Sequence, residues 1–138
     1  MKAKPIIISL LTLFIFSFTS AQTSITNTLI GNWEGKDGDG TTGGLNFIDS
    51  IHVIVTIPGK LFPTGEYIID STKTPMWFDI TFKQGKNVQT MTGIIKLIND
   101  TRLKWQISTT GKRSETFNKE KTDNTIILIK RSSLINKD

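Results

Sequence analysis

Apolar and polar residues alternate at every second position along most of this chain. The segment from Met76 to Lys83 shows the pattern clearly, because Phe78, Ile80 and Phe82 fall on one side of an extended strand. Similar segments follow one another along the sequence, and no segment shows the 3.6-residue period of an amphipathic helix. A chain with this pattern folds into a sheet that buries one face of each strand.

Turn-forming residues divide the alternating region into eight expected strands. These are Leu29–Glu34, Leu45–Ile48, Ile51–Ile57, Gly65–Asp70, Met76–Lys83, Val88–Ile98, Thr101–Thr109 and Thr125–Arg131. A loop rich in glycine and aspartate is expected over Lys36–Gly44, and a tight hairpin turn at Asn99–Asp100, because both residues tolerate positive φ. Closing a sheet removes its unpaired edges, so we predict an all-β fold, an antiparallel eight-stranded barrel.

The N-terminus has the pattern of a cleaved secretory signal peptide over residues 1–21. Lys2 and Lys4 precede an uncharged run from Ile6 to Phe18, and Thr19-Ser20-Ala21 offers small residues before a mature start at Gln22. The run is shorter than the ~18–20 apolar residues that a membrane-spanning helix needs, so no stable membrane anchor is expected. We therefore expect an exported protein, periplasmic or extracellular, whose residues 22–138 form a single domain.

The composition excludes several kinds of chemistry. The chain has no cysteine, so it has no disulfide, thiol nucleophile or thiolate metal site, and it has a single histidine, His52. Its basic residues are scattered, which does not favour nucleic-acid binding. No nucleophile–base pair or metal-ligand set is visible. We therefore expect a protein that is not an enzyme and that carries no metal or other cofactor.

Two weaker patterns are interpreted as structural. Residues 37–40 read Asp-Gly-Asp-Gly, but the calcium loop of an EF-hand would need a third ligand at position 41 and a glutamate at position 48. Thr41 and Ile48 stand there instead, so a flexible loop is expected. His52 has no serine, aspartate or glutamate at a catalytic spacing, and it is interpreted as a surface or barrel-wall residue.

The tripeptide Gly31-Asn32-Trp33 resembles the G-x-W opening of lipocalin-like barrels. The resemblance implies that Trp33 closes one end of the barrel and that an arginine from the last strand lies over its ring. Arg131 ends the last expected strand, so a cation–π contact between Trp33 and Arg131 is expected, with a structural role.

A longer block resembles a family of small uncharacterised bacterial domains, abundant in planctomycetes and related to lipocalin-like proteins. Its members share the pattern G-x-Y-x-x-D-x-(S/T)-K-x-P-x-x-x-D-(I/L). The matching residues here are Gly65, Tyr67, Asp70, Thr72, Lys73, Pro75, Asp79 and Ile80, followed by Gly93, Ile94, Leu97, Asp100, Leu103, Arg113 and Phe117. The chain departs from the family at Ile95, Gln106 and Ser114. The resemblance covers nearly the whole mature chain and implies a lipocalin-like, calycin-type barrel without an assigned activity.

The block itself is interpreted mainly as a structural turn. Short side chains between Asp70 and Pro75 can accept hydrogen bonds from turn amides, and Pro75 can begin a strand without a ladder donor. Asp70 and Asp79 are expected to cap the turn or to pair with Lys73. A polar site at the barrel mouth, made of Glu66, Asp70, Lys73 and Asp79, is the functional alternative.

The leading functional hypothesis is binding of a small apolar or amphipathic molecule in the barrel mouth. Tyr67, Phe78, Phe82 and Trp105 would supply the apolar wall, with Lys73 or Arg113 at the rim; whether the interior is hollow is left open. The alternative is a protein-interaction module, such as a periplasmic inhibitor or an envelope-assembly partner. That module would use the arm Gln22–Thr28 and the loop Lys36–Gly44.

Overall fold

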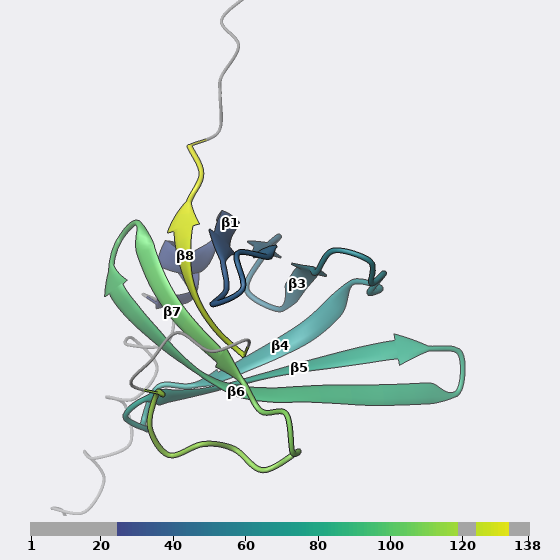
Figure 1. Ribbon diagram of the computed structural model, residues 1–138. Helices are drawn as coiled ribbons and strands as arrows, with labels where there is room; N and C mark the ends of the chain where they lie inside the picture. The colour runs from purple at the N-terminus through teal and green to yellow at the C-terminus, as the bar shows by residue number, and fades with distance from the viewer. Residues whose placement is uncertain (1–24, 119–123, 133–138) are drawn as a thin grey trace, which may run out of the picture.

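The computed structural model describes residues 25–118 and 124–132, which form a closed barrel of eight antiparallel strands (Figure 1). The strands are β1 (Gly31–Lys36), β2 (Thr42–Phe47), β3 (His52–Thr56), β4 (Gly65–Asp70), β5 (Met76–Gln84), β6 (Asn87–Asn99), β7 (Arg102–Ile107) and β8 (Thr125–Lys130). Each strand pairs with its neighbours in sequence, and β8 pairs with β1 to close the barrel. This up-and-down order confirms the predicted antiparallel, lipocalin-like barrel.

The strand boundaries agree with the alternation to within a few residues, with two informative differences. The loop expected over Lys36–Gly44 is shorter, because β2 already begins at Thr42 and Gly44 pairs with Glu34. Glycine is required there by close approach: a Cβ atom on Gly44 would lie 2.5 Å from the carbonyl oxygen of Trp33. Gly44 therefore serves strand packing, while the turn itself is confined to residues 37–41.

The turn between β6 and β7 also differs from the expectation. A tight hairpin forms there, but Asn99 pairs with Arg102, so the two turn residues are Asp100 and Thr101, and neither of them has positive φ. Instead, Asn99 Oδ1 accepts hydrogen bonds from Thr101 N at 3.0 Å and Thr101 Oγ1 at 3.1 Å. The asparagine side chain thus closes the turn as an acceptor, and the register shifts between Leu97 and Asn99.

Aromatic side chains fill the middle of the barrel. The ring centroids of Phe47 and Tyr67 lie 5.0 Å apart in an edge-to-face arrangement, and Phe78 lies 6.0 Å from Tyr67 and 6.2 Å from Trp105. All four residues are buried. The interior is therefore a packed core made of the inward-facing residues that the alternation predicted.

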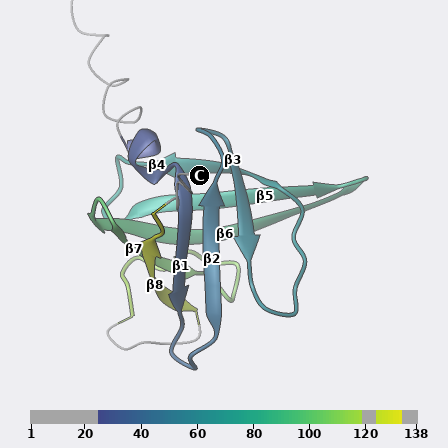
Figure 2. The same cartoon turned by 90° about the horizontal axis from the view of Figure 1, so that it is seen from above.

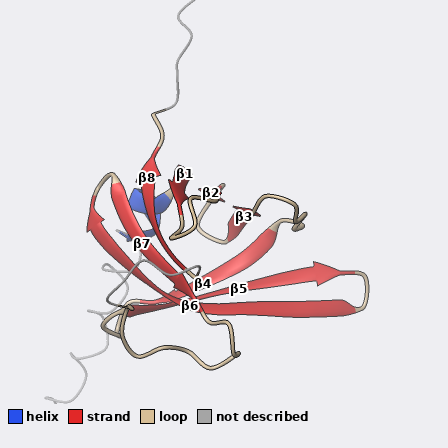
Figure 3. Ribbon diagram, in the orientation of Figure 1, coloured by secondary structure: helices blue, strands red, loops and turns tan. Residues whose placement is uncertain are grey.

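One end of the barrel is covered by a short helical segment, residues 25–29, drawn in blue in Figure 3. Ile25 packs against the core and Leu29 is fully buried, so residues 25–28 do not form the exposed arm that the alternative hypothesis required. Residues 22–24 of that arm lie outside the described residues, as does the expected signal peptide. Among the residues described, no helix is long and apolar enough to cross a membrane.

The strands β5 and β6 extend beyond the barrel wall as a long hairpin, which projects past β3 in the view from above (Figure 2). The two residues of its turn are Gly85, with φ of +62°, and Lys86. Positive φ at the first turn position alone is typical of a type II′ turn, which suits the twist of a hairpin. Near the hairpin, Phe82 is buried beneath Phe62, with 5.2 Å between the ring centroids.

Candidate functional site

The four predicted apolar wall residues all point into the barrel, and the hollow that the described residues form beside them is small. Tyr67, Phe78, Phe82 and Trp105 are each at most 5% exposed. This hollow lies beside the β1–β2 turn and has a volume of about 80 Å³, with Trp105, Ile107 and Ile126 among its lining residues. That space suits a few water molecules, whereas pockets for organic ligands usually measure about 300–1,000 Å³.

The two predicted rim cations lie on the outer wall, not at the mouth. The Nζ atom of Lys73 lies 4.7 Å from the centre of the Trp77 ring, and the guanidinium carbon of Arg113 lies 4.5 Å from it. Trp77 faces outward because it alternates with the buried Phe78 on β5. The structure therefore separates the six predicted ligand-binding residues into an interior aromatic group and an exterior cationic pair.

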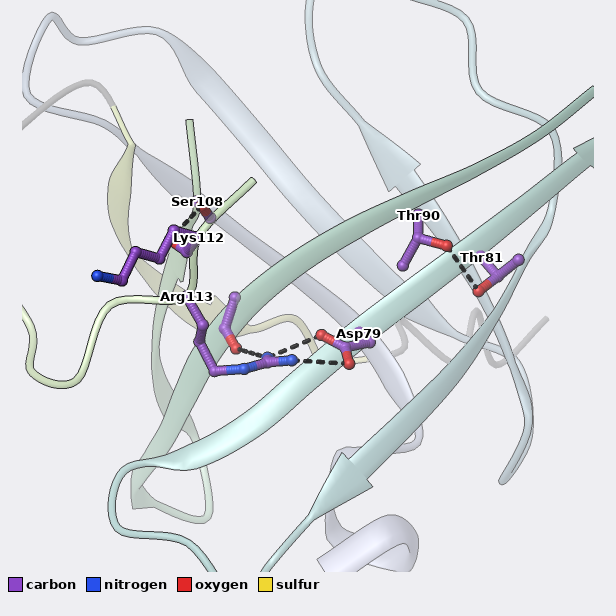
Figure 4. A network of polar contacts seen from close by, with 7 residues as sticks. Asp79, Thr81, Thr90, Ser108, Lys112 and Arg113 are labelled. Atoms are coloured by element: carbon purple, nitrogen blue, oxygen red, sulfur yellow. Dashed lines mark hydrogen bonds and ion pairs between the residues drawn. The ribbon is translucent and has the colours of Figure 1, made fainter. Parts of the chain in front are cut away.

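Arg113 fastens the connection between β7 and β8 to this outer wall (Figure 4). Its guanidinium donates two hydrogen bonds to the Asp79 carboxylate, at 2.7 and 2.9 Å, and one to the carbonyl oxygen of Gly93 at 2.6 Å. A bidentate contact of this kind fixes the orientation of the guanidinium as well as its distance from the carboxylate. The partner of Asp79 is therefore Arg113 and not Lys73.

The fastened connection covers a second, smaller packed layer outside the barrel. Ile94 and Gln106 are each 1% exposed, although both lie on the outward-facing side of the sheet. The side-chain oxygen of Gln106 accepts hydrogen bonds from Asn118 N at 2.8 Å and from Thr125 Oγ1 at 3.0 Å. The segment 113–118 is thus held against β5, β6 and β7 at both of its ends.

A groove of about 430 Å³ lies at the edge of this layer. Its lining comes from the β4–β5 turn, from β6 and from the held segment: Ser71, Lys73, Thr74, Pro75, Met76, Ile95, Lys96, Leu97, Thr116 and Phe117. Most of the lining surface is apolar, and two lysines border it. A groove with this volume and this mixture of groups suits a molecule that has an apolar body and one charged end.

Two lysines beside the groove face one another without a carboxylate between them in the described part of the chain. Lys96 and Lys104 are direct cross-strand partners, and neither forms an ion pair with a carboxylate in the part of the chain that is described. Lys104 also lies 4.8 Å from the centre of the Phe117 ring. Like charges directly opposite one another in a sheet are destabilising, and an anion placed between them would relieve that repulsion.

The β4–β5 turn that forms one wall of the groove is organised by Asp70. Its carboxylate accepts hydrogen bonds from the hydroxyl and the backbone N–H of Thr72, and these bonds lower the pKa of Asp70, with a smaller contribution from Lys73. This confirms the expected capping role of Asp70. The polar mouth site does not form as proposed, because two of its four residues have other partners. Glu66 forms an ion pair with Lys83 at 3.2 Å, and Asp79 forms an ion pair with Arg113.

The covered end of the barrel corrects a further prediction. Trp33 is fully buried and donates a hydrogen bond from Nε1 to the carbonyl oxygen of Leu29 at 2.7 Å. The cation over its ring is Lys130, 5.3 Å from the ring centre, and not Arg131. Because side chains alternate along β8, Arg131 lies on the other side and pairs with Glu34 at 2.9 Å. Trp33 thus lies at the covered end of the barrel, and the cation on its ring is Lys130, the residue before the expected Arg131.

A hydrogen-bonded group around Asp49 was not recognised in the sequence. Asp49 accepts hydrogen bonds from the backbone N–H groups of Ile51 and His52, and its second oxygen lies 2.8 Å from His52 Nδ1. These contacts, with that of the imidazole first, lower the pKa of the Asp49 carboxyl to about 2. The Tyr67 hydroxyl donates to the carbonyl oxygen of Asp49 at 2.9 Å. The histidine therefore belongs to a turn that is tied to the core.

Tyr67 gives a prediction for alkaline pH. Burial, helped by the nearby negative charge of Asp49, raises the pKa of Tyr67 to about 12 from 10.0. Because the folded state holds the proton more tightly, its contribution to stability is fully present below pH 10 and is lost as the pH rises through 12. We expect the free energy of unfolding to fall by about 2 kcal/mol from this source by pH 12.

The measurement is denaturant unfolding of the wild type and of Tyr67→Phe at several pH values. Tyr67 is the only tyrosine in the chain, so the ultraviolet absorbance of its phenolate reports the titration without ambiguity. The variant should show a shallower loss of stability above pH 10. A phenolate that titrates near pH 10 in the folded protein, or an unchanged slope in the variant, would show that burial does not hold this proton.

The carboxylate of Asp37 organises the aspartate-rich turn between β1 and β2. Asp37 Oδ1 accepts the backbone N–H groups of Asp39 at 3.0 Å and Thr41 at 2.9 Å, which uses the carboxylate to shape the turn. Among the described residues, no group of three or more histidine, aspartate or glutamate side chains is placed to hold a metal ion.

Comparisons of this chain with protein-family models, with curated proteins and with solved structures gave no match. The relation to the planctomycete domains therefore stays a prediction from the residues that carry it. Several of those residues lie around the groove. Asp70 and Pro75 belong to the β4–β5 turn that forms one wall, and the contact between Asp79 and Arg113 holds the segment that forms the opposite wall.

The sequence reasoning missed Lys96, Lys104 and the outer groove. Counting residues across the Asn99 turn places Lys96 roughly opposite Lys104, so their proximity could have been found. The attachment of Phe117 to the outer wall could not, because it depends on a contact between residues 79 and 113 across a connection without periodicity.

Proposed function

We propose that the protein is an exported, non-catalytic binding module that holds a small amphipathic molecule with an anionic end. The site is the outer groove between the β4–β5 turn and Phe117. The observation that carries the proposal is a mainly apolar groove of about 430 Å³ beside the lysine pair Lys96 and Lys104, which no described carboxylate neutralises. The apolar body would lie along Pro75, Leu97 and Phe117, with the anionic group between the lysines.

The proposal keeps the predicted ligand class and changes the place of binding. The packed aromatic core and the hollow of about 80 Å³ favour the outer wall over the barrel mouth. Binding at an exposed groove with charged edges has two consequences: affinity falls when salt screens the lysines, and it depends on the sign of the ligand's charge.

The test uses dodecanoate and dodecyltrimethylammonium as probes of equal chain length and opposite charge. Isothermal titration calorimetry should show that dodecanoate binds more tightly than the cationic probe. Lys96→Gln should weaken dodecanoate binding by about threefold to tenfold, as expected for the loss of one partly screened charge contact. The matched control is Lys86→Gln, because that lysine is exposed at the far β5–β6 turn and its loss should leave the affinity unchanged.

Nuclear magnetic resonance then locates the bound probe. Dodecanoate should shift the signals of Leu97 and Phe117. Shifts confined to Trp105 and Ile107 would instead place the ligand in the barrel mouth and overturn the proposed site. Equal affinity for the two probes, or equal effects of the two lysine variants, would show that the lysine pair does not select the ligand.

A further inference from the structure

A row of three lysines and one isoleucine crosses the outer wall of four neighbouring strands. The strands β6, β7, β8 and β1 follow one another around the barrel (Figure 1). Lys96 lies opposite Lys104, and Lys104 lies opposite Ile127 on its other side. Ile127 in turn lies opposite Lys36. These residues point outward, because they alternate with residues that face the core, and strand spacing gives the row a length of about 14 Å.

A second row runs beside the first, nearer the covered end of the barrel. Ile129 lies between Arg102 on β7 and Glu34 on β1. Glu34 is the only carboxylate in these four strands, and it is paired with Arg131 at 2.9 Å. The three lysines and Arg102 form no ion pair with any carboxylate that the structure describes. We call the following residues the basic face: Lys36, Lys96, Arg102, Lys104, Ile127 and Ile129.

The opposite side of the barrel has the opposite sign of charge. The strands β3, β4 and β5 contain three carboxylates, those of Glu66, Asp70 and Asp79, and a single lysine, Lys83. The basic face is therefore a local concentration of charge and does not simply reflect the composition of the whole chain. A barrel with one positive and one negative wall turns its positive wall toward a negatively charged surface.

Exposed isoleucines stand among these cations and favour a lipid surface over other anionic partners. Ile129 is 50% exposed, and Ile98, at the end of β6, is 46% exposed. Nucleic acid would neutralise the lysines but would leave the isoleucines beside charged phosphates. Protein interfaces are rich in aromatic residues and poor in lysine, whereas the outward residues of these four strands include three lysines and no aromatic side chain. Basic and aliphatic side chains together match the boundary between headgroups and acyl chains.

We propose that the basic face docks on the anionic surface of a phospholipid bilayer. The lysines and Arg102 lie among the headgroup phosphates, with Ile98 and Ile129 at the acyl boundary. Each basic residue beside such a surface raises the binding constant by about fivefold, and salt weakens the effect. The groove that Lys96 borders adjoins the same face, so an amphipathic molecule could pass between the bilayer and the groove. The docking itself does not depend on that ligand.

The test is co-sedimentation of the mature protein with vesicles of phosphatidylcholine, alone or mixed with phosphatidylglycerol. The protein should bind the mixed vesicles, and added salt should weaken the binding. Replacing both Lys36 and Arg102 by glutamine should weaken it by about 25-fold. Neither residue lines the groove, so dodecanoate affinity should not change. The matched control replaces Lys60 and Lys86 by glutamine, because these exposed lysines lie in other turns and their loss changes the net charge equally.

Nuclear magnetic resonance supplies the orientation of the docked protein. In bicelles that contain a spin-labelled phosphatidylglycerol, the methyl signals of Ile98 and Ile129 should broaden. Those of Ile68, which is 71% exposed on β4, should stay sharp. Equal broadening of Ile68 and Ile129, or equal losses of vesicle binding in the two double variants, would overturn the proposal. A protein that binds dodecanoate but not the mixed vesicles would overturn the docking alone, whereas vesicle binding without dodecanoate binding would support it.

Discussion

Replacing Gly35 by alanine is expected to open the barrel between β1 and β8. A Cβ atom at this position would lie 1.9 Å from the carbonyl oxygen of Ile127, and these are backbone atoms of a ladder that closes the barrel. Side-chain rotation cannot relieve such an overlap, so the two strands must separate. We expect a loss of about 3 kcal/mol or more in the free energy of unfolding, at the upper end of what overpacking usually costs.

The matched control for this prediction is Gly43→Ala. Gly43 is the cross-strand partner of Gly35, but a Cβ atom there would lie 3.3 Å from its nearest neighbour, the carbonyl oxygen of Thr56. A shift of a few tenths of an ångström accommodates it, so its effect should be much smaller. Both variants are compared by denaturant unfolding. Similar stabilities for the two would mean that β1 and β8 lie farther apart than described.

Replacing Trp33 by alanine is expected to cost about 3–5 kcal/mol, the range for removing a large buried aromatic side chain. Trp33 is fully buried at the covered end, where its ring lies beneath Lys130 and its Nε1–H binds the carbonyl oxygen of Leu29. The substitution leaves a cavity, removes that hydrogen bond and frees the helical segment that rests on the ring. Denaturant unfolding measures the loss.

Trp77→Ala provides the comparison of equal size on the outer wall. Trp77 is 40% exposed and carries Lys73 and Arg113 on its ring, so its removal should cost about 1 kcal/mol through lost cation–π and surface contacts. A Trp33 variant as stable as the Trp77 variant would refute the closing role of Trp33. The same pair tests the resemblance to G-x-W barrels, which gives Trp33 the structural part.

The alternation of apolar and polar residues predicted most of the fold, because every strand of a barrel points its side chains alternately inward and outward. Phe78, Ile80 and Phe82 face the core, as their spacing required, and the same alternation located all eight strands. The alternation could not predict contacts that depend on a single side-chain atom. Asn99 closes its turn through a side-chain oxygen. Lys130 lies over the Trp33 ring because the side chain of Lys130 is on the inner side of β8, whereas that of Arg131 is on the outer side.

The candidate site was harder to predict because the residues that form it are not periodic. The sequence suggested that Arg113 and the interior aromatic residues act together, since all of them suit a ligand. In the structure, the pairing of Arg113 with Asp79 draws a long connection onto the outer wall and creates a groove beside Phe117. Local patterns carry no information about such a contact until the sheet has brought both partners to the same side.

The short pairing between β3 and β4 has a consequence for how the barrel moves. Within the described chain, these strands pair only through His52 with Glu66 and Val53 with Gly65, supported by a hydrogen bond from Tyr67 N to Ile51 O. Every other junction in the barrel has a longer ladder. The wall therefore has a seam, and partial unfolding should begin there, with β1–β3 swinging away as one leaf while the β5–β6 hairpin keeps its shape.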